Sequence, residues 1–362
     1  MSHPVQISVC MAAYNAASFV GAAITSVLGQ SFRDFELLIV DDGSGDGTLE
    51  ILRQFARLDP RVKLLRNDGN RGLVYSRNRL LQCASAPFVA IADADDICEP
   101  TRLEKQIGWL LNHPETGVCG AAVTFIGDSP PGRRDDVAVY GEAQIRFFMR
   151  LLPCFWNTTT MYRLGLLKQA GSYRAGFDAG AEDYDLWSRL LPLTRFANLP
   201  EPLVKVRVHA ASVTAQGSRC FENVLSVSAR LLGDYLQQPV PLAIRTDFHA
   251  FLMRGTIEAT ACERAFRFAL ALYRQARRLE TPETLRAFTQ LLAPAAWTHA
   301  RNLVYSAPGL SREMARSAFR MQPSLLARGE AWGYVIRTGM PRTATRWISQ
   351  WRRPARTGGK PV

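Results

Sequence analysis

Two apolar runs in the first hundred residues each end in a group of acidic side chains. The run 87–92 precedes Asp93-Ala94-Asp95-Asp96, and the run 36–40 precedes Asp41-Asp42. Short apolar runs of this kind are typical of strands buried on both faces of a parallel sheet. Because open α/β sheets bind ligands at the carboxyl ends of their strands, the two acidic groups predict one site at a shared sheet edge.

Three carboxylates lie within residues 93–96, and a bound cation would reduce the repulsion between them. Like charges at this spacing repel one another unless a cation or bound donors compensate them. A hard divalent ion with oxygen ligands is the usual partner, and it would also hold a diphosphate. The sequence therefore predicts a site for Mn²⁺ or Mg²⁺ together with a phosphorylated ligand.

Helical and strand patterns alternate through the first part of the chain, which predicts an α/β fold with a mostly parallel central sheet flanked by helices. Beyond about residue 218 the strand patterns stop and helical patterns follow one another. We expect the α/β domain to span 1–217 and a helical C-terminal region to span 218–352. The Pro-, Gly- and Arg-rich tail 353–362 is expected to be disordered.

Bulk composition excludes several classes. With 47% hydrophobic and 21% charged residues the chain is expected to be globular rather than disordered. No apolar run reaches eighteen residues, so no spanning helix is expected. The first residues lack a basic segment followed by an apolar core, so no secretory signal is expected. Seven scattered cysteines fit a reducing cytoplasm better than a disulfide framework.

The positive charge is concentrated near the C-terminus. The net charge is +12, and residues 301–362 hold eleven Arg and one Lys against two Glu, which is +10 of that total. Trp347 and Trp351 lie among these arginines, a pattern that favours peripheral attachment to an anionic membrane surface. The competing interpretation is a solvated helical cap over the fold. A nucleic-acid partner is not expected, because nothing resembles a nucleic-acid-binding module.

Six groups of residues form an ordered set of motifs: 8–15, 30–32 with 36–44, 70–72 with 77–78, 92–96, 182–187 and 206–209. Taken together, they resemble the family 2 glycosyltransferases of the bacterial cell-envelope type, which are inverting enzymes with the GT-A fold. The resemblance covers Ile7 to about Thr214, roughly 60% of the chain.

The resemblance implies that a sugar moves from a nucleotide diphosphate, with UDP expected, to a hydroxyl of a lipid-linked or growing glycan acceptor. Roles in donor binding are implied for Ala12, Tyr14, Asn15, Asp41, Asp42, Arg77, Asp93 and Asp95. Asp42 matches the acid that binds the nucleotide base, and Asp93 points toward the ribose. Asp95 and His209 match ligands of the divalent metal.

Inversion in a single displacement needs a base that takes the acceptor proton. Asp183 matches the family's base, with Glu182 and Asp185 as competitors. The roles of three more residues stay open at this level. His209 could be a structural hydrogen-bonding residue, Arg77 could pair with nearby acids instead of the diphosphate, and no contact is assigned to Asp96.

Two rival functions are considered. A nucleotidyltransferase would need a glycine-rich phosphate loop near the N-terminus followed by a basic residue, and residues 12–17 lack both. A non-catalytic sugar-nucleotide-binding subunit of a glycan assembly complex would be favoured by loss of Asp95 or Asp183, and both are present.

Overall fold

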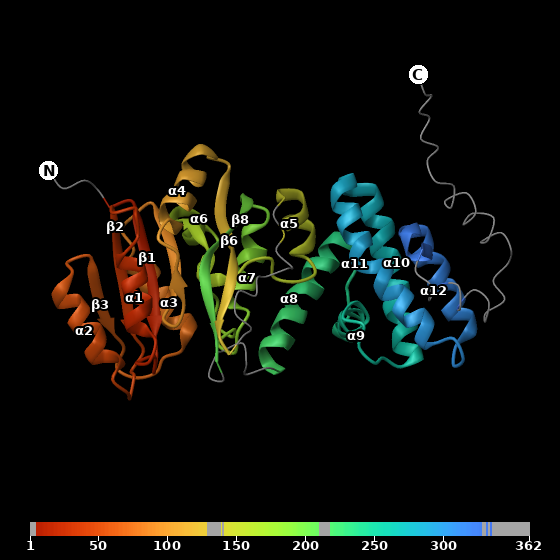
Figure 1. The fold of residues 1–362 in the computed structure, drawn as a ribbon, viewed down its shortest axis with the longest axis horizontal. Helices are drawn as coiled ribbons and strands as arrows, with labels where there is room; N and C mark the ends of the chain where they lie inside the picture. Colours follow the sequence, from red (N-terminus) through yellow and green to blue (C-terminus); the bar gives the residue numbers. More distant parts are fainter. Residues whose placement is uncertain are drawn as a thin grey trace, which may run out of the picture. The chain divides into compact units, whose positions relative to one another are not determined.

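The structure, a computed structural model, describes residues 5–128, 139, 141–209, 218–327, 331 and 334. The strands of this part of the chain form one sheet in the order β3-β2-β1-β4-β7-β6-β8-β5 (Figure 1). Their bounds are β1 Ile7–Ala13, β2 Phe35–Asp41, β3 Val62–Arg66, β4 Phe88–Asp93, β5 Ile97–Cys98, β6 Thr116–Gly127, β7 Met161–Arg163 and β8 Arg195–Val208.

The sheet is mixed, with parallel pairing in its N-terminal half. β3, β2, β1 and β4 pair in parallel, and so do β6 and β8. The short strand β7 is antiparallel to both β4 and β6, and β5 is antiparallel to β8. The predicted parallel arrangement therefore holds for the strands that carry the acidic groups, while β7 reverses direction in the middle of the sheet.

Helices cover both faces of this sheet. On one face, β1 residues such as Val9 and Met11 pack with Ile24 of α1 and Leu103 of α4. On the other, Cys10 and Leu38 belong to the core that includes Trp187 of α7. The helix bounds here are α1 Val20–Leu28, α2 Thr48–Leu58, α3 Leu73–Cys83, α4 Arg102–Asn112, α5 Glu142–Phe148, α6 Leu164–Gln169, α7 Glu182–Leu190 and α8 Ser218–Leu236, with a 3₁₀ turn η1 at Asn157–Thr159.

Register in the parallel half brings the acidic strand ends together. Ala13 of β1 lies opposite Asp41 of β2, and Ala12 lies opposite Asp93 of β4. Parallel strands that are paired in this way end at the same sheet edge. The predicted meeting of the two acidic groups at one edge is thus confirmed.

Helix α8 packs on the core of the sheet. Val227 and Leu231 belong to the same core as Trp187, and the Asn223 amide donates to the carbonyl oxygen of Gly180 at 2.9 Å. The chain divides into compact units at Met1–Tyr235 and Leu236–Val362. The sequence predicts a domain boundary at residue 217, where the strand patterns stop. The compact unit that contains the sheet also includes α8 as far as Tyr235.

The described part of the second unit is helical, as predicted. Its elements are α9 Leu242–Leu252, α10 Ala259–Leu279, α11 Pro282–Asn302, α12 Pro308–Met321 and the 3₁₀ turn η3 Pro323–Ala327. Its core is aromatic: Phe251 packs against Phe266 and His299, and Trp297 against Phe319. Within the described ranges, no helix is long and apolar enough to cross a membrane. The predicted tail 353–362 lies outside the described residues.

Candidate active site at the strand ends

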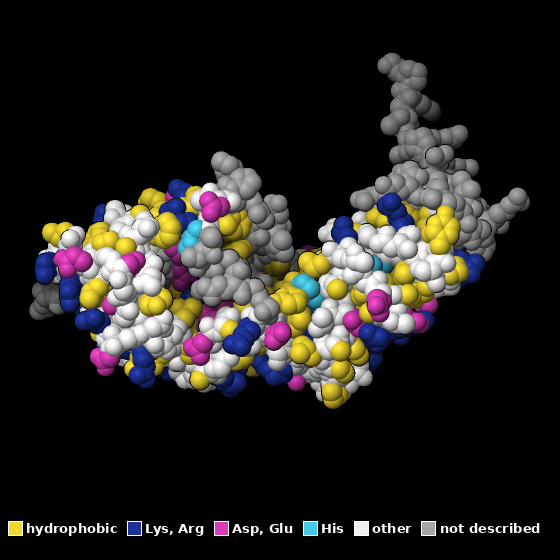
Figure 2. Space-filling model, turned by 90° about the horizontal axis from the view of Figure 1, so that it is seen from below, with side chains coloured by type: hydrophobic (Ala, Val, Ile, Leu, Met, Phe, Trp, Pro, Cys, Tyr) yellow, Lys and Arg dark blue, Asp and Glu magenta, His cyan; other side chains and the backbone are white. Residues whose placement is uncertain are grey.

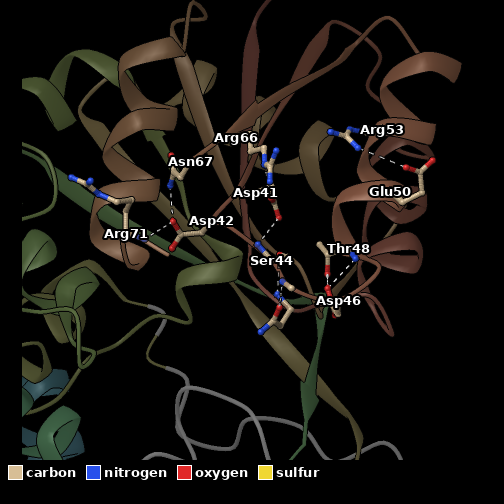
Figure 3. A network of polar contacts seen from close by, with 12 residues as sticks. Asp41, Asp42, Ser44, Asp46, Thr48, Glu50, Arg53, Arg66, Asn67 and Arg71 are labelled. Carbon is tan, nitrogen blue, oxygen red and sulfur yellow. Dashed lines mark hydrogen bonds and ion pairs between the residues drawn. The ribbon is translucent and has the colours of Figure 1, made fainter. Parts of the chain in front are cut away.

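Asp42, directly after β2, is buried beneath a loop that it holds in place. Its Oδ1 accepts hydrogen bonds from the Asn67 amide at 2.6 Å and the Arg71 backbone N–H at 2.9 Å (Figure 3). Its Oδ2 accepts from the Gly72 backbone N–H at 2.9 Å. Gly72 has φ +90°, a conformation that favours glycine. A carboxylate has about four acceptor positions, so Asp42 keeps capacity for one further donor, such as a nucleotide base.

The loop after β1 is joined to the loop after β2. Asn15 has φ +48°, and its side-chain oxygen accepts from the Gly45 N–H at 2.9 Å. Its own N–H donates to Ser44 Oγ at 3.0 Å. Asp41 is fully buried and accepts from the Ser44 N–H at 3.3 Å (Figure 3). The predicted residues Ala12 and Tyr14 flank this junction, and Tyr14 is 48% exposed at its rim.

The acids after β4 are tied to the end of β8. Asp96 is buried, and its Oδ1 accepts from the Arg207 N–H at 2.8 Å. The Arg207 guanidinium donates to the Asp95 carbonyl oxygen at 3.0 Å. Burial, together with the carboxylates of Asp93 and Asp95, raises the pKa of Asp96 to about 8. Asp96, which had no role at the sequence level, therefore anchors the chain segment that leads to His209.

This anchoring brings the two predicted metal ligands together. His209 Nε2 lies 3.0 Å from Asp95 Oδ2, and both side chains are partly exposed. One carboxylate oxygen and one imidazole nitrogen form an incomplete ligand set, which suits an ion whose other ligands come from water or a diphosphate. Across the described ranges, no group of three or more His, Cys, Asp and Glu residues has metal-binding geometry. The pair fits a shared ion but not a closed structural site.

The three acids at the start of α7 have different surroundings. Glu182 forms an ion pair with Arg77 and is buried. Asp185 is paired with Arg189 at 2.9 Å. Asp183 has no ion pair within the described residues and is only partly buried, with Oδ1 accepting from the Tyr184 N–H at 2.6 Å.

The pKa of Asp183 is raised by its surroundings. Burial first, and then the neighbouring Glu182 carboxylate, raise the pKa of Asp183 to about 7. A general base works best when its pKa is near the working pH. The residue before α7, Ala181, has φ +71°, so the helix begins from a strained backbone conformation. The role of Asp183 as the base stays a prediction, and its lack of an ion pair among the described residues is compatible with it.

Arg77 pairs with nearby acids, which is the alternative to diphosphate binding that the sequence left open. It is 6% exposed, and its guanidinium contacts both Glu182 and Asp93, the latter at 3.1 Å. With the Asn157 amide oriented so that its oxygen faces Arg77, that oxygen accepts at 2.8 and 3.2 Å. A diphosphate contact by Arg77 stays a prediction. Asn157 and Tyr173, whose ring lies 5.7 Å from the Arg77 guanidinium, were not expected here, because the sequence assigns neither of them a role in the site.

Comparison with known proteins identifies the family. The model of "Glycosyl transferase family 2" matches residues 8–171. A UDP-Glc:alpha-D-GlcNAc-diphosphoundecaprenol beta-1,3-glucosyltransferase of Escherichia coli, WfgD, is 40% identical over 236 residues, covering 65% of this chain and 88% of WfgD. The O-antigen biosynthesis glycosyltransferase WbnJ of Escherichia coli is 30% identical over 62% of this chain and 87% of its own. A glycosyltransferase of Haemophilus influenzae is 31% identical, and 65% of its length is covered.

Among solved structures, Staphylococcus aureus TarS residues 1–349 in complex with UDP-GlcNAc superposes with a TM-score of 0.55 at 17% identity, covering 88% of this chain and 91% of TarS. At that identity the likeness concerns the fold, and it confirms the predicted GT-A class. The relatives favour a glycosyltransferase over a nucleotidyltransferase or a non-catalytic subunit. This chain is a glycosyltransferase and belongs to glycosyl transferase family 2.

Proposed function

We propose that this glycosyltransferase is metal-dependent and inverting, with a UDP-sugar as donor and a hydroxyl of a lipid-linked or growing glycan as acceptor, in surface polysaccharide biosynthesis. The observation that carries the proposal is that acids with different surroundings lie close to one sheet edge. Asp42 follows β2, Asp93 ends β4 and Asp95 comes just after it, and β1 lies between these two strands. Asp183, with its raised pKa, lies in the first turn of α7.

The donor half would be formed by the loops after β1, β2 and β4. Asp42, with acceptor capacity remaining, would take a donor from the nucleotide base, and Asp93 would face the ribose. Asn15 and Asp41 would hold the first loop in shape through Ser44 and Gly45. Ala12 would let the backbone come close to the nucleotide, and Tyr14 would cover it from the rim.

The metal would be held by Asp95 and His209, whose facing atoms are 3.0 Å apart. A mixed oxygen and nitrogen pair suits Mn²⁺. When bound, the ion would neutralise charge on the departing diphosphate, which is Lewis-acid assistance to the leaving group. Asp183 would accept the proton of the acceptor hydroxyl while that oxygen attacks the anomeric carbon from the face opposite the diphosphate.

Support for the substrate class comes from a relative that is covered over most of its length. WfgD, at 40% identity, is named for a UDP-Glc donor and a diphosphoundecaprenol-linked acceptor. An acceptor of that kind is anchored in a membrane, and we accordingly propose action at the cytoplasmic membrane face. WbnJ is named for O-antigen biosynthesis, which fits the same setting.

A donor screen tests the substrate proposal. The protein is incubated with Mn²⁺ and a panel of UDP-, GDP-, CMP- and dTDP-sugars, and release of the nucleotide is measured. We expect slow hydrolysis with one or more UDP-sugars, because the acceptor is replaced by water. Hydrolysis confined to another nucleotide would contradict the UDP proposal, and release that is unchanged by a chelator would contradict metal dependence.

We further propose that the helical unit attaches the enzyme peripherally to anionic lipid. The sequence prediction rests on the basic residues of 301–362, and residues 340–362 of that segment lie outside the described residues. Helix α12 shows how three of these arginines are placed: Arg312, Arg316 and Arg320 recur every fourth residue, so they share one face, and all are exposed. No acidic partner pairs with them among the described residues. Figure 2 shows Lys and Arg side chains distributed over the visible face of the helical unit.

Reversal of this α12 charge should weaken membrane binding. Each basic residue near an anionic surface contributes about 1 kcal/mol, so the triple variant R312E/R316E/R320E should lose most salt-sensitive flotation with phosphatidylserine vesicles. The variant R53E/R57E on exposed α2 is the control and should float as the parent does. Deletion of residues 340–362 measures how much of the vesicle binding depends on that segment. If the full chain does not float at low salt, the membrane proposal is wrong.

A further inference from the structure

The guanidinium of Arg77 joins the donor half of the site to the proposed base. Arg77 lies on α3, while Asp93 ends β4 and Glu182 begins α7. Nη2 contacts Asp93 at 3.1 Å, and Nη1 contacts Glu182. Arg77 and Glu182 are 6% and 5% exposed. A buried guanidinium and a buried carboxylate are costly to separate, so this pair fixes the start of α7 relative to β4.

The donors of Arg77 are largely committed within the protein. One arm is used by each acid, and the Asn157 oxygen, in the orientation given above, lies within reach of both terminal nitrogens. A diphosphate would have to displace at least one of these partners from a site that is almost closed to solvent. The geometry thus disfavours the role in diphosphate binding that the sequence predicted.

We propose that Arg77 is a positioning residue, whose buried contacts with Asp93 and Glu182 hold Asp183 toward the acceptor hydroxyl and set the charge around it. The inference rests on the proposed role of Asp183 as base. In this arrangement Glu182 is the residue of α7 through which Arg77 holds the start of that helix. Arg77 is then not one of the donor-binding residues. The metal pair Asp95–His209 has no part in it.

The electrostatics of Asp183 agree with this arrangement. Burial and Glu182 raise its pKa, and Arg77 lowers it. The charged and titratable groups that face Asp183 from the surrounding elements are Glu182, Arg77, Asp93, Tyr162, Tyr173 and Cys220. Because a base acts when ionised, transfer should rise with pH through the pKa of Asp183, about 7, and level off above it. Removal of the Glu182 charge and removal of the Arg77 charge should move this rise in opposite directions.

The pH dependence of kcat/KM in Glu182→Gln and Arg77→Gln tests the inference. The acidic limb is the part of the pH profile in which kcat/KM rises with pH. Loss of the Glu182 charge should move this limb to lower pH, and loss of the Arg77 charge should move it to higher pH, each by about one pH unit. Arg77→Lys keeps the charge but not the two-armed contact, so its limb should stay in place while kcat falls. Asp185→Asn, which breaks the Arg189 pair on the same helix, is the matched control and should leave the limb unmoved.

A second measurement separates positioning from diphosphate binding. UDP and UMP are titrated with Mn²⁺ into the parent and Arg77→Lys, which remains informative if Arg77→Gln does not fold. A positioning role predicts that the preference for UDP over UMP is retained. Loss of that preference, or an unmoved limb in Glu182→Gln, overturns the inference. Normal transfer by Asp183→Asn, assayed in parallel, would instead show that the proposed base is wrong.

Discussion

Asp183→Asn should lower the rate of sugar transfer by about 10²–10⁴-fold, the usual contribution of a positioned general base. Asparagine has nearly the same shape as aspartate but cannot take the acceptor proton. Freedom from an ion pair among the described residues distinguishes Asp183 from its two neighbours on α7, and burial raises its pKa to about 7. The measurement is the initial rate with saturating donor at pH 8, where Asp183 is ionised.

Two controls accompany this rate. Asp185→Asn changes the same side-chain type two residues later, on a face that pairs with Arg189, and should retain most activity. Thermal melts of both variants establish that the fold is intact. Transfer by Asp183→Asn at the parent rate would mean that another group takes the proton.

Asp95→Asn should abolish the Mn²⁺ dependence of UDP binding. Even the loss of an outer-shell partner costs about 10–100-fold in metal affinity, so loss of a proposed ligand should weaken UDP binding by at least about 10-fold. Calorimetric titration of UDP with Mn²⁺ measures this, and a chelator should bring the parent to the same low affinity. His209→Ala should reproduce a large part of the loss.

Asp34→Asn provides the matched control for Asp95→Asn. Asp34 is an exposed acid just before β2, at the opposite end of that strand from Asp41. Its loss should leave metal-dependent binding unchanged. Equal affinity of the parent for UDP with and without chelator would show that Asp95 and His209 do not hold an ion needed by the donor.

The sequence predicted the acidic strand ends because local patterns encode them. The run before Asp93 is apolar at every position, so it forms a strand buried on both faces, and the acids come where that strand ends. The helix that begins at Glu182 is likewise encoded locally, because acids are favoured at a helix N-terminus and three of them lie in its first turn. Trp187, five residues after Glu182, is fully buried, and its indole N–H donates to the Tyr162 hydroxyl at 2.7 Å.

Long-range contacts could not be predicted in this way. Asp96 meets Arg207 across 111 residues, and Arg77 meets Glu182 across 105. Neither partner is implied by spacing or periodicity, since both contacts depend on how the strands are ordered. The three-residue strand β7 is too short to give a pattern, yet it reverses the sheet. The amphipathic helix α8 did not reveal on which unit its apolar face would pack.

The most direct test of the divided site is the titration of UDP with Mn²⁺ into Asp183→Asn. If Asp42, Asp93, Asp95 and His209 form the donor half and Asp183 only takes the acceptor proton, this variant should bind UDP as the parent does while failing to transfer sugar. Loss of UDP binding in a variant that melts as the parent does would contradict the division, because Asp183 would then belong to the donor half.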